Sequence, residues 1–245
     1  ANNPYMFTDM EKAKSLADSL TADAGITEKV LNNPRPNILL IILESFGNTL
    51  IGPLGGDPLT TPNLNKMIDE GLVFSNFYAS GNRTDKALPA ILNGYPAQPS
   101  ASIIKEAKKT QSLESLVKIL NGHKYHSSFW YGGDINFADF KSFVISSGFR
   151  EIITMENFNR SDFNSKWGVH DHVFFKALRD SMEKVEEPFF RVALTLSSHE
   201  PFEVPMKPVF EGNDNLTKFR NSVYYTDKTL GDFISWAKTT DWWHN

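Results

Sequence analysis

The sequence predicts an α/β domain with a mostly parallel sheet and helices on both of its faces. Two observations predict this fold. Apolar runs alternate with helix-like stretches between residues 37 and 238, which is typical of strand–helix–strand units. The run at residues 37–43 is almost continuously apolar, as expected of a strand that is buried on both faces. With 245 residues, the chain is long enough for one large domain with a substantial core.

The elements follow one another in a regular order. Residues 1–36 are polar and end in a proline-rich stretch, so they are expected to form a linker with one short helix capped by Asp9. Residues 37–245 are expected to form one α/β domain. Pro62 suits the first position of a helix, and Gly122 and Gly148 each close a helical pattern. The expected strands are residues 37–43, 72–78, 125–131, 149–153 and 188–197. The expected helices are residues 9–20, 61–71, 84–92, 112–121, 136–147, 170–185 and 217–238.

Composition excludes several classes of function. The chain has no cysteine, which excludes disulfides, thiolate metal sites and cysteine nucleophiles. Its formal net charge is −4, without the basic surplus of a nucleic-acid binder, so no nucleic-acid partner is expected. No apolar run approaches the roughly 20 residues that span a bilayer.

Three polar residues each follow a predicted strand: Glu44, Asp134 and His199. In a parallel sheet with helices on both faces, ligands bind outside the carboxyl ends of the strands. We therefore expect these three side chains to lie along one edge of the sheet, where they would define a site.

Glu44 and Thr84 are the candidates for chemistry at that edge. Glu44 is either a ligand for a hard divalent cation or a solvent-exposed strand end. Thr84 suits a helix N-cap, and it also suits a nucleophile, because a helix N-terminus and a metal both favour an alkoxide. The two interpretations of Thr84 are compatible. Arg83 would hold phosphate oxygens or be a surface arginine.

His199 and Asp134 are candidates for substrate contacts. His199 would donate a hydrogen bond to a phosphoryl oxygen or protonate a leaving group, although a lone histidine is more often structural. Asp134 follows two glycines and would be a turn residue or a substrate ligand. The triplet of residues 170–172 (His-Asp-His) is not expected to bind metal, because adjacent side chains on a helix point in different directions. Capping and surface roles are expected there instead.

Five sequence segments follow one another along the chain. They are residues 35–45, residues 82–84 with Pro89 and the Gly-Tyr-Pro at 94–96, the Tyr-Gly-Gly-Asp at 131–134, the Lys-Trp-Gly-Val at 166–169, and the Leu-Ser-Ser-His-Glu-Pro-Phe at 196–202. In this order they resemble the extracellular catalytic domain of the lipoteichoic acid synthase group, within the alkaline phosphatase and sulfatase superfamily. One segment alone would be a weak signal, whereas five in order are fairly specific. The resemblance covers about residues 35–245, and it implies that residues 37–245 form a sulfatase-like catalytic domain in truncated form.

The resemblance implies a metal-dependent transferase. Thr84 would be the nucleophile and form a phospho-threonine intermediate, and Glu44 and Thr84 would bind a divalent metal, manganese in most of the group, with magnesium or zinc as alternatives. Asp134 and His199 would match substrate-binding positions. The reaction would transfer phosphoglycerol from the headgroup of a membrane phospholipid to an acceptor. The site would be extracytoplasmic, periplasmic or at the cell surface, and anchored to the membrane by helices that precede the domain in full-length relatives.

Two departures from the group's pattern lead to further expectations. Asp85 stands where the group often has serine, which could shift the preference for metal or substrate. Relatives also continue into a strand that ends in an Asp-His pair of metal ligands. The ligand set within residues 1–245 is therefore expected to be incomplete, and this chain alone is expected to bind metal weakly and to be inactive.

Three alternatives stay open at this point. A sulfatase would need Cys or Ser in a Cys/Ser-x-Pro-x-Arg segment, which residues 84–88 do not match. A phosphodiesterase or phosphatase would use the same site with water as the acceptor. A non-catalytic module would keep the fold and bind a headgroup or a glycan.

Overall fold

The computed structural model describes residues 8–22, 25, 28–136 and 139–245. The chain divides into two units, residues 1–34 and residues 35–245. The first unit contains one helix, α1 (Met10–Thr21). As expected from the sequence, Asp9 caps it, and the Asp9 carboxylate accepts a hydrogen bond from the Lys12 backbone N–H at 2.8 Å.

The second unit is built on a four-stranded parallel sheet with the strand order β1-β4-β2-β3. The strands are β1 (Ile38–Ile42), β2 (His126–Tyr131), β3 (Glu151–Ile153) and β4 (Phe189–Leu194). β4 lies in the middle of the sheet and all six of its residues are buried. The prediction of a mostly parallel sheet with helices is confirmed, and the carboxyl ends of all four strands meet at one edge.

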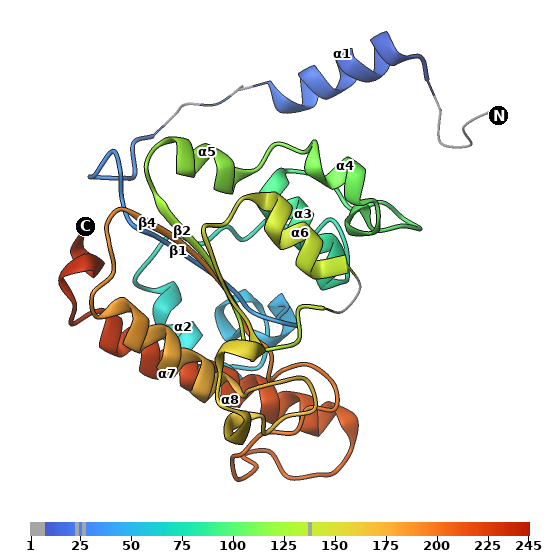
Figure 1. Cartoon of the computed structure of the whole chain (residues 1–245). Coiled ribbons are helices and arrows are strands. Elements are labelled where there is room, and N and C mark those ends of the chain that lie inside the picture. The colour runs from blue at the N-terminus through green and yellow to red at the C-terminus, as the bar shows by residue number, and fades with distance from the viewer. Residues whose placement is uncertain (1–7, 23–24, 26–27, 137–138) are drawn as a thin grey trace. The chain divides into compact units, whose positions relative to one another are not determined.

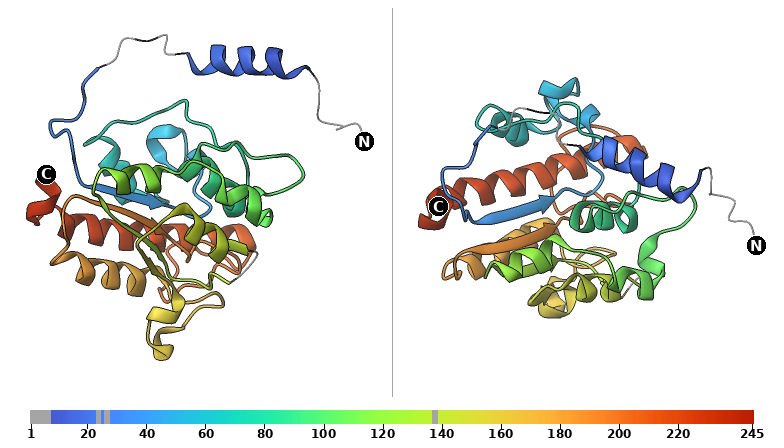
Figure 2. Two further views of the ribbon diagram at one scale, coloured as in Figure 1. Left: turned by 45° about the horizontal axis from the view of Figure 1, so that its top comes forward. Right: turned by 90° about the horizontal axis from the view of Figure 1, so that it is seen from above.

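Helices cover both faces of this sheet (Figure 1 and Figure 2, left view). One face carries α3 (Thr84–Asn93), α4 (Ala107–Gln111), α5 (Leu116–Gly122) and α6 (Phe140–Ser147). The other carries α2 (Pro62–Ile68), α7 (Asp171–Met182) and α8 (Asn215–Ala237). Over the part of the chain that the structure describes, no helix combines the length and the apolar character needed to cross a membrane.

Alternate residues of β4 belong to two separate hydrophobic clusters, one on each face. Phe190, Val192 and Leu194 pack with the helices α3, α5 and α6. Phe189 and Ala193 pack with α7 and α8. Because strand side chains point alternately to opposite faces, a strand buried on both sides is apolar at most positions. Arg191 is the exception in β4.

Several helices begin later than the sequence pattern suggests. α5 begins at Leu116 because the Ser115 hydroxyl accepts the backbone N–H of Val117 at 3.2 Å and sets the cap there. α6 begins at Phe140, four residues after the expected start. The glycine that ends α6, Gly148, has a left-handed backbone with φ 97°, as its sequence position predicts.

The expected strand at residues 72–78 is wrong. The structure has bends and extended backbone there, and the large apolar side chains are exposed, with Phe77 and Tyr78 each 83% exposed. The segment has the composition of a strand. Within the described ranges, however, β1 pairs only with β4, so no neighbouring strand supplies the ladder that a strand requires.

The surface role expected for Asp171 is also wrong, because this carboxylate is fully buried. It accepts the Thr226 hydroxyl at 2.6 Å and the backbone N–H groups of Leu196 at 2.9 Å and Ser197 at 3.3 Å. Burial raises the pKa of Asp171, and the same hydrogen bonds oppose that rise. Asp171 thus ties α7 and α8 to the chain that leaves β4.

Replacing Asp171 by alanine is expected to lower the free energy of unfolding by roughly 3 kcal/mol, because three buried donors lose their acceptor. Urea unfolding measures this change. Asp180→Ala, at an exposed position on the same helix, is the control and should change stability by less than about 0.5 kcal/mol. Equal losses in the two variants would contradict the role assigned to Asp171.

Candidate active site

Glu44 lies just beyond the carboxyl end of β1, and β4 holds its backbone in place. Its N–H donates to the Thr195 hydroxyl at 2.9 Å, and its carbonyl accepts the Ser198 hydroxyl at 2.6 Å. Thr195 and Ser198 are both buried. The next residue, Ser45, has φ 61°, a conformation that non-glycine residues rarely adopt, and this turns the chain sharply away from the strand.

Thr84 and Glu44 are in direct contact. The Thr84 hydroxyl donates to the Glu44 carboxylate, with 2.8 Å between Oγ1 and Oε2. The Ser45 hydroxyl reaches the other carboxylate oxygen at 3.1 Å. The structure therefore joins two candidate residues that are forty positions apart in the sequence.

The interpretation of Thr84 as an N-cap is wrong. Arg83 occupies the cap position without a side-chain cap bond, and Thr84 is the first residue of α3. The backbone N–H groups of Thr84 and Asp85 have no acceptor in the part of the chain that the structure describes. Free N–H groups at a helix N-terminus favour a bound phosphate beside the Thr84 hydroxyl.

Tyr131, the last residue of β2, was not a candidate from the sequence. Burial raises the pKa of its phenol, and the nearby negative charges of Glu44 and Asp134 add to the effect. The phenol therefore keeps its proton and can donate to an oxyanion near Glu44. The aromatic residue in the Tyr-Gly-Gly-Asp segment was the sequence signal for this role.

Asp134 follows β2 at the same edge and is exposed. Its carboxylate accepts the backbone N–H of Asn136 at 2.8 Å and the side-chain amide of Asn136 at 3.0 Å. This is the turn role that the sequence left open. No direct bond joins Asp134 to Glu44 or Thr84 among the described residues.

The loop that carries Trp167 packs tightly against the end of β2. Gly133 and Gly168 form an isolated antiparallel bridge, and the Val169 N–H donates to the Gly132 carbonyl at 3.0 Å. Gly168 has φ 149°, and an added Cβ would lie 2.1 Å from the Gly132 oxygen. The close approach of the two backbones therefore requires glycine at position 168.

His199 lies beyond β4, edge to face with Trp167 at 5.1 Å between ring centroids. Its Nδ1 is 3.0 Å from the Glu200 carbonyl, which also accepts the Trp167 indole N–H at 2.5 Å. A small pocket adjoins these rings and is lined by Trp167, His170, Leu196, His199, Pro201 and Glu203. The structure thus places His199 at the expected edge but not in contact with Thr84. Trp167 was quoted in a motif but was not predicted to line the site.

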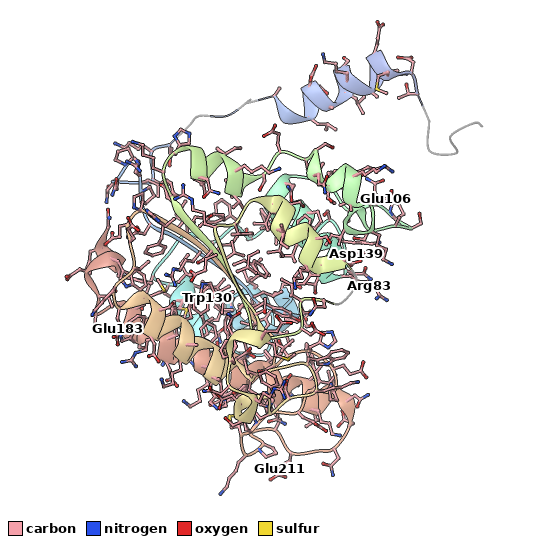
Figure 3. The ribbon with its side chains drawn as sticks, viewed as in Figure 1. Arg83, Glu106, Trp130, Asp139, Glu183 and Glu211 are labelled. Atoms are coloured by element: carbon pink, nitrogen blue, oxygen red, sulfur yellow. The ribbon has the colours of Figure 1, made fainter. Side chains whose placement is uncertain are left out.

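Arg83 is exposed (Figure 3), and none of the residues that the structure describes forms a hydrogen bond or ion pair with its guanidinium. It precedes Thr84 at the start of α3, so its long side chain is free to follow a ligand. Of the predicted site residues, the structure brings Glu44 and Thr84 together. Arg83 precedes Thr84, and Asp134 and His199 follow β2 and β4 at the same edge, with no hydrogen bond or ion pair to Glu44 or Thr84 among the described residues.

The Glu44–Thr84 pair offers two hard oxygen ligands, which fit part of a site for magnesium, manganese or zinc. No group of three or more histidine, aspartate or glutamate side chains in the described ranges is arranged to hold a metal. The residues present therefore fit a divalent cation that takes its remaining ligands from elsewhere.

The fold and this edge define a domain of the sulfatase type. A family model described as Sulfatase matches residues 36–245, and the chain belongs to that family. Relatives include lipoteichoic acid synthases. The chain is 23% identical to the lipoteichoic acid synthase-like YvgJ of Bacillus subtilis, over 96% of this chain and 40% of the relative. It is 28% identical to the lipoteichoic acid synthase of Staphylococcus saprophyticus, over 96% of this chain and 41% of that relative. The chain thus spans about two fifths of these relatives.

Solved structures place the chain in the alkaline phosphatase superfamily. A protein of that superfamily from Vibrio parahaemolyticus is 29% identical, with a TM-score of 0.85 over 96% of this chain and 61% of that one. The lipoteichoic acid synthase LtaP of Listeria monocytogenes shares the fold, with a TM-score of 0.72 and 19% identity. The match covers 83% of this chain and 52% of LtaP. The phosphoglycerol transferase GacH of Streptococcus pyogenes, in complex with sn-glycerol-1-phosphate, has a TM-score of 0.61 and 17% identity. The match covers 94% of this chain and 63% of GacH.

Replacing Thr195 by valine is expected to lower the free energy of unfolding by about 1–3 kcal/mol, because the Glu44 N–H loses its acceptor with little change in volume. Chemical denaturation measures this loss. Thr239→Val, at an exposed position after α8, is the matched control and should have little effect. A Thr195→Val variant as stable as the parent would show that this bond does not hold Glu44.

Proposed function

We propose that this domain is a metal-dependent phosphoglycerol transferase that acts on the headgroups of membrane phospholipids through Thr84. One observation carries the proposal: the Thr84 hydroxyl donates to the Glu44 carboxylate at 2.8 Å, at the N-terminus of α3 and the carboxyl edge of the sheet. The sulfatase-family match and the lipoteichoic acid synthase relatives favour phosphoglycerol as the transferred group.

The proposed reaction has two steps. Thr84 Oγ1 attacks the phosphorus of the headgroup and loses its proton to water, because a Glu44 carboxylate that holds the cation would not act as the base. The bond from phosphorus to the lipid oxygen breaks, and the lipid alcohol leaves with a proton from His199 or from water. A hydroxyl of the acceptor then attacks the same phosphorus and gives its proton to water, the bond to Thr84 breaks, and Thr84 Oγ1 takes up a proton. A divalent cation bound at Glu44 and Thr84 would lower the pKa of the hydroxyl and offset negative charge on the phosphoryl oxygens.

The remaining residues of the edge would bind and orient the phosphoryl group. The free N–H groups at the start of α3, the Arg83 guanidinium and the Tyr131 phenol are donors that can meet its oxygens. His199 would donate to an oxygen or protonate the leaving alcohol. Asp134 and Trp167 would contact the glycerol part. The transfer reaction would take place on the outer side of the cytoplasmic membrane.

Residues 84–88 read Thr-Asp-Lys-Ala-Leu, without the cysteine or serine nucleophile of a sulfatase. This favours phosphorus over sulfur as the reacting centre. The same two steps with water as acceptor would give a phosphodiesterase, so the transfer assay must compare an alcohol acceptor with water.

Thr84→Ala in the whole protein is expected to lower turnover of a phosphoglycerol lipid analogue by at least about 10³-fold, because the attacking oxygen is lost. Thr84→Ser, which keeps a hydroxyl, should retain measurable turnover and a covalent phosphoryl adduct detectable by mass spectrometry. Thr239→Ala is the control. Unchanged turnover in Thr84→Ala would remove Thr84 from the mechanism.

Residues 1–245 alone are expected to bind Mn²⁺ weakly, because Glu44 and Thr84 supply only two of the four or more ligands that such an ion requires. Calorimetry with the 245-residue chain should give a shallow isotherm, and Glu44→Gln should weaken it further. A tight, stoichiometric isotherm would show that this chain already holds a complete site.

A further inference from the structure

A pocket of about 220 Å³ opens at the amino ends of β2, β3 and β4, beside the end of α7. It has room for several water molecules, each of which takes about 30 Å³ in the liquid. Its charged and polar lining residues are His126, Ser127, Ser128, Arg150, Glu151, Lys184, Glu186 and Arg191. None of these residues belongs to the candidate active site.

Arg191 lies at the base of this pocket and is only 8% exposed. Its guanidinium lies 5.5 Å from the centre of the Trp130 ring and donates one hydrogen bond, from Nη1 to the Ser181 hydroxyl at 2.6 Å. No carboxylate forms an ion pair with it in the described part of the chain, although Glu151 is close enough for its charge to act on the guanidinium. Burying a charge without a partner is costly, so this guanidinium favours an anion.

Ser128 stands beside Arg191 in the register of β2 and β4, and both side chains lie on the same face of the sheet. The Ser128 oxygen accepts the indole N–H of Trp130 at 3.0 Å. Its own O–H has no acceptor among the residues that the structure describes. Two buried donors, a guanidinium and a hydroxyl, therefore face the pocket side by side.

The rim adds further positive charge. Arg150 and Lys184 line the pocket, and neither side chain makes an ion pair within the described ranges. Against these cations stand two carboxylates, Glu151 and Glu186. Glu186 already faces His126, with 3.3 Å between Oε1 and Nε2. The pocket lining therefore carries three arginine or lysine side chains and two carboxylates, a formal net charge of +1 with histidine counted as neutral.

We propose that this pocket binds a phosphate group, either as inorganic phosphate or as the phosphomonoester of a small alcohol. Arg191 and Ser128 would hold oxygens at the base, and Arg150 and Lys184 would hold the others at the rim. Donors that approach from several directions suit a tetrahedral dianion better than a planar carboxylate. The inference goes beyond the proposed transfer reaction and does not depend on it.

The pocket is distinct from the catalytic edge. Ser128 lies three residues before Tyr131 on the same strand, which corresponds to about 10 Å along β2. In Figure 3, Glu183, which follows α7, is far from Arg83 at the start of α3, and Trp130 lies between them. An anion in the pocket would thus be a second ligand rather than the group that reacts.

The test is calorimetric titration of the 245-residue chain with inorganic phosphate and, separately, with glycerol phosphate. We expect saturable binding at one site. The double variant Arg150→Ala/Lys184→Ala should weaken it by at least about tenfold, because hydrogen bonds to a charged group are lost. Both substituted residues are exposed, so the fold should persist, which circular dichroism checks. Lys176→Ala/Lys228→Ala removes the same charge from the outer surfaces of α7 and α8 and is the control.

Titrations of further variants distinguish binding in this pocket from binding at the candidate active site. Binding that survives His199→Ala but is lost in Arg150→Ala/Lys184→Ala supports the proposal. Binding that is lost in His199→Ala but kept in that double variant would overturn it, as would an equal loss in the lysine control or no saturable binding. Acetate that binds as tightly as phosphate would also overturn it. Tighter binding of glycerol phosphate than of inorganic phosphate would assign the pocket to a phosphomonoester, and equal binding would assign it to free phosphate.

Discussion

The parallel pairing of β1 with β4 is the constraint on which the candidate active site depends. β1 and β4 end side by side, with Ile42 opposite Leu194, so the chain that leaves β4 runs next to Glu44. There, the hydroxyls of Thr195 and Ser198 bind the backbone N–H and carbonyl of Glu44. Glu44 in turn accepts the hydroxyl of Thr84, which comes from a helix on one face of the sheet. A strand pair thus fixes the carboxylate, the carboxylate fixes the hydroxyl, and the start of α3 directs its free N–H groups to the same place.

Buried polar groups organise the other face of the sheet. Asp171 is surrounded by donors and ties α7 and α8 to the loop beyond β4. Arg191 is also buried, but it has a single hydrogen bond within the described residues. The contrast separates two roles for a buried charge. A carboxylate whose acceptor capacity is used holds helices together, whereas a guanidinium with unused donors at the base of a pocket favours a ligand.

The sequence predicted the parallel sheet and its order of elements because apolar runs and helix ends are local signals. It also placed Glu44 at the carboxyl edge of the sheet from its position after a strand, whereas the pairing of Glu44 with Thr84 rested on the chemistry of a carboxylate and a hydroxyl and on the family resemblance. It could not show that Asp134 turns its carboxylate to Asn136, or that Asp171 is buried, because each depends on which donors the folded chain brings near. The segment that contains Phe77 and Tyr78 has the pattern of a strand. A strand also needs a neighbouring strand to pair with, and the sequence pattern of one segment cannot show whether such a neighbour exists.

Gly168 allows the loop that carries Trp167 to touch the backbone of the loop that follows β2. Its hydrogen atom occupies the space where any side chain would collide with the Gly132 carbonyl, so the backbone behind Trp167 cannot shift without moving the backbone ahead of Asp134. Trp167 also supports the ring of His199. The backbone contact at Gly168 and the ring contact of Trp167 therefore couple the loop after β2 to the loop after β4.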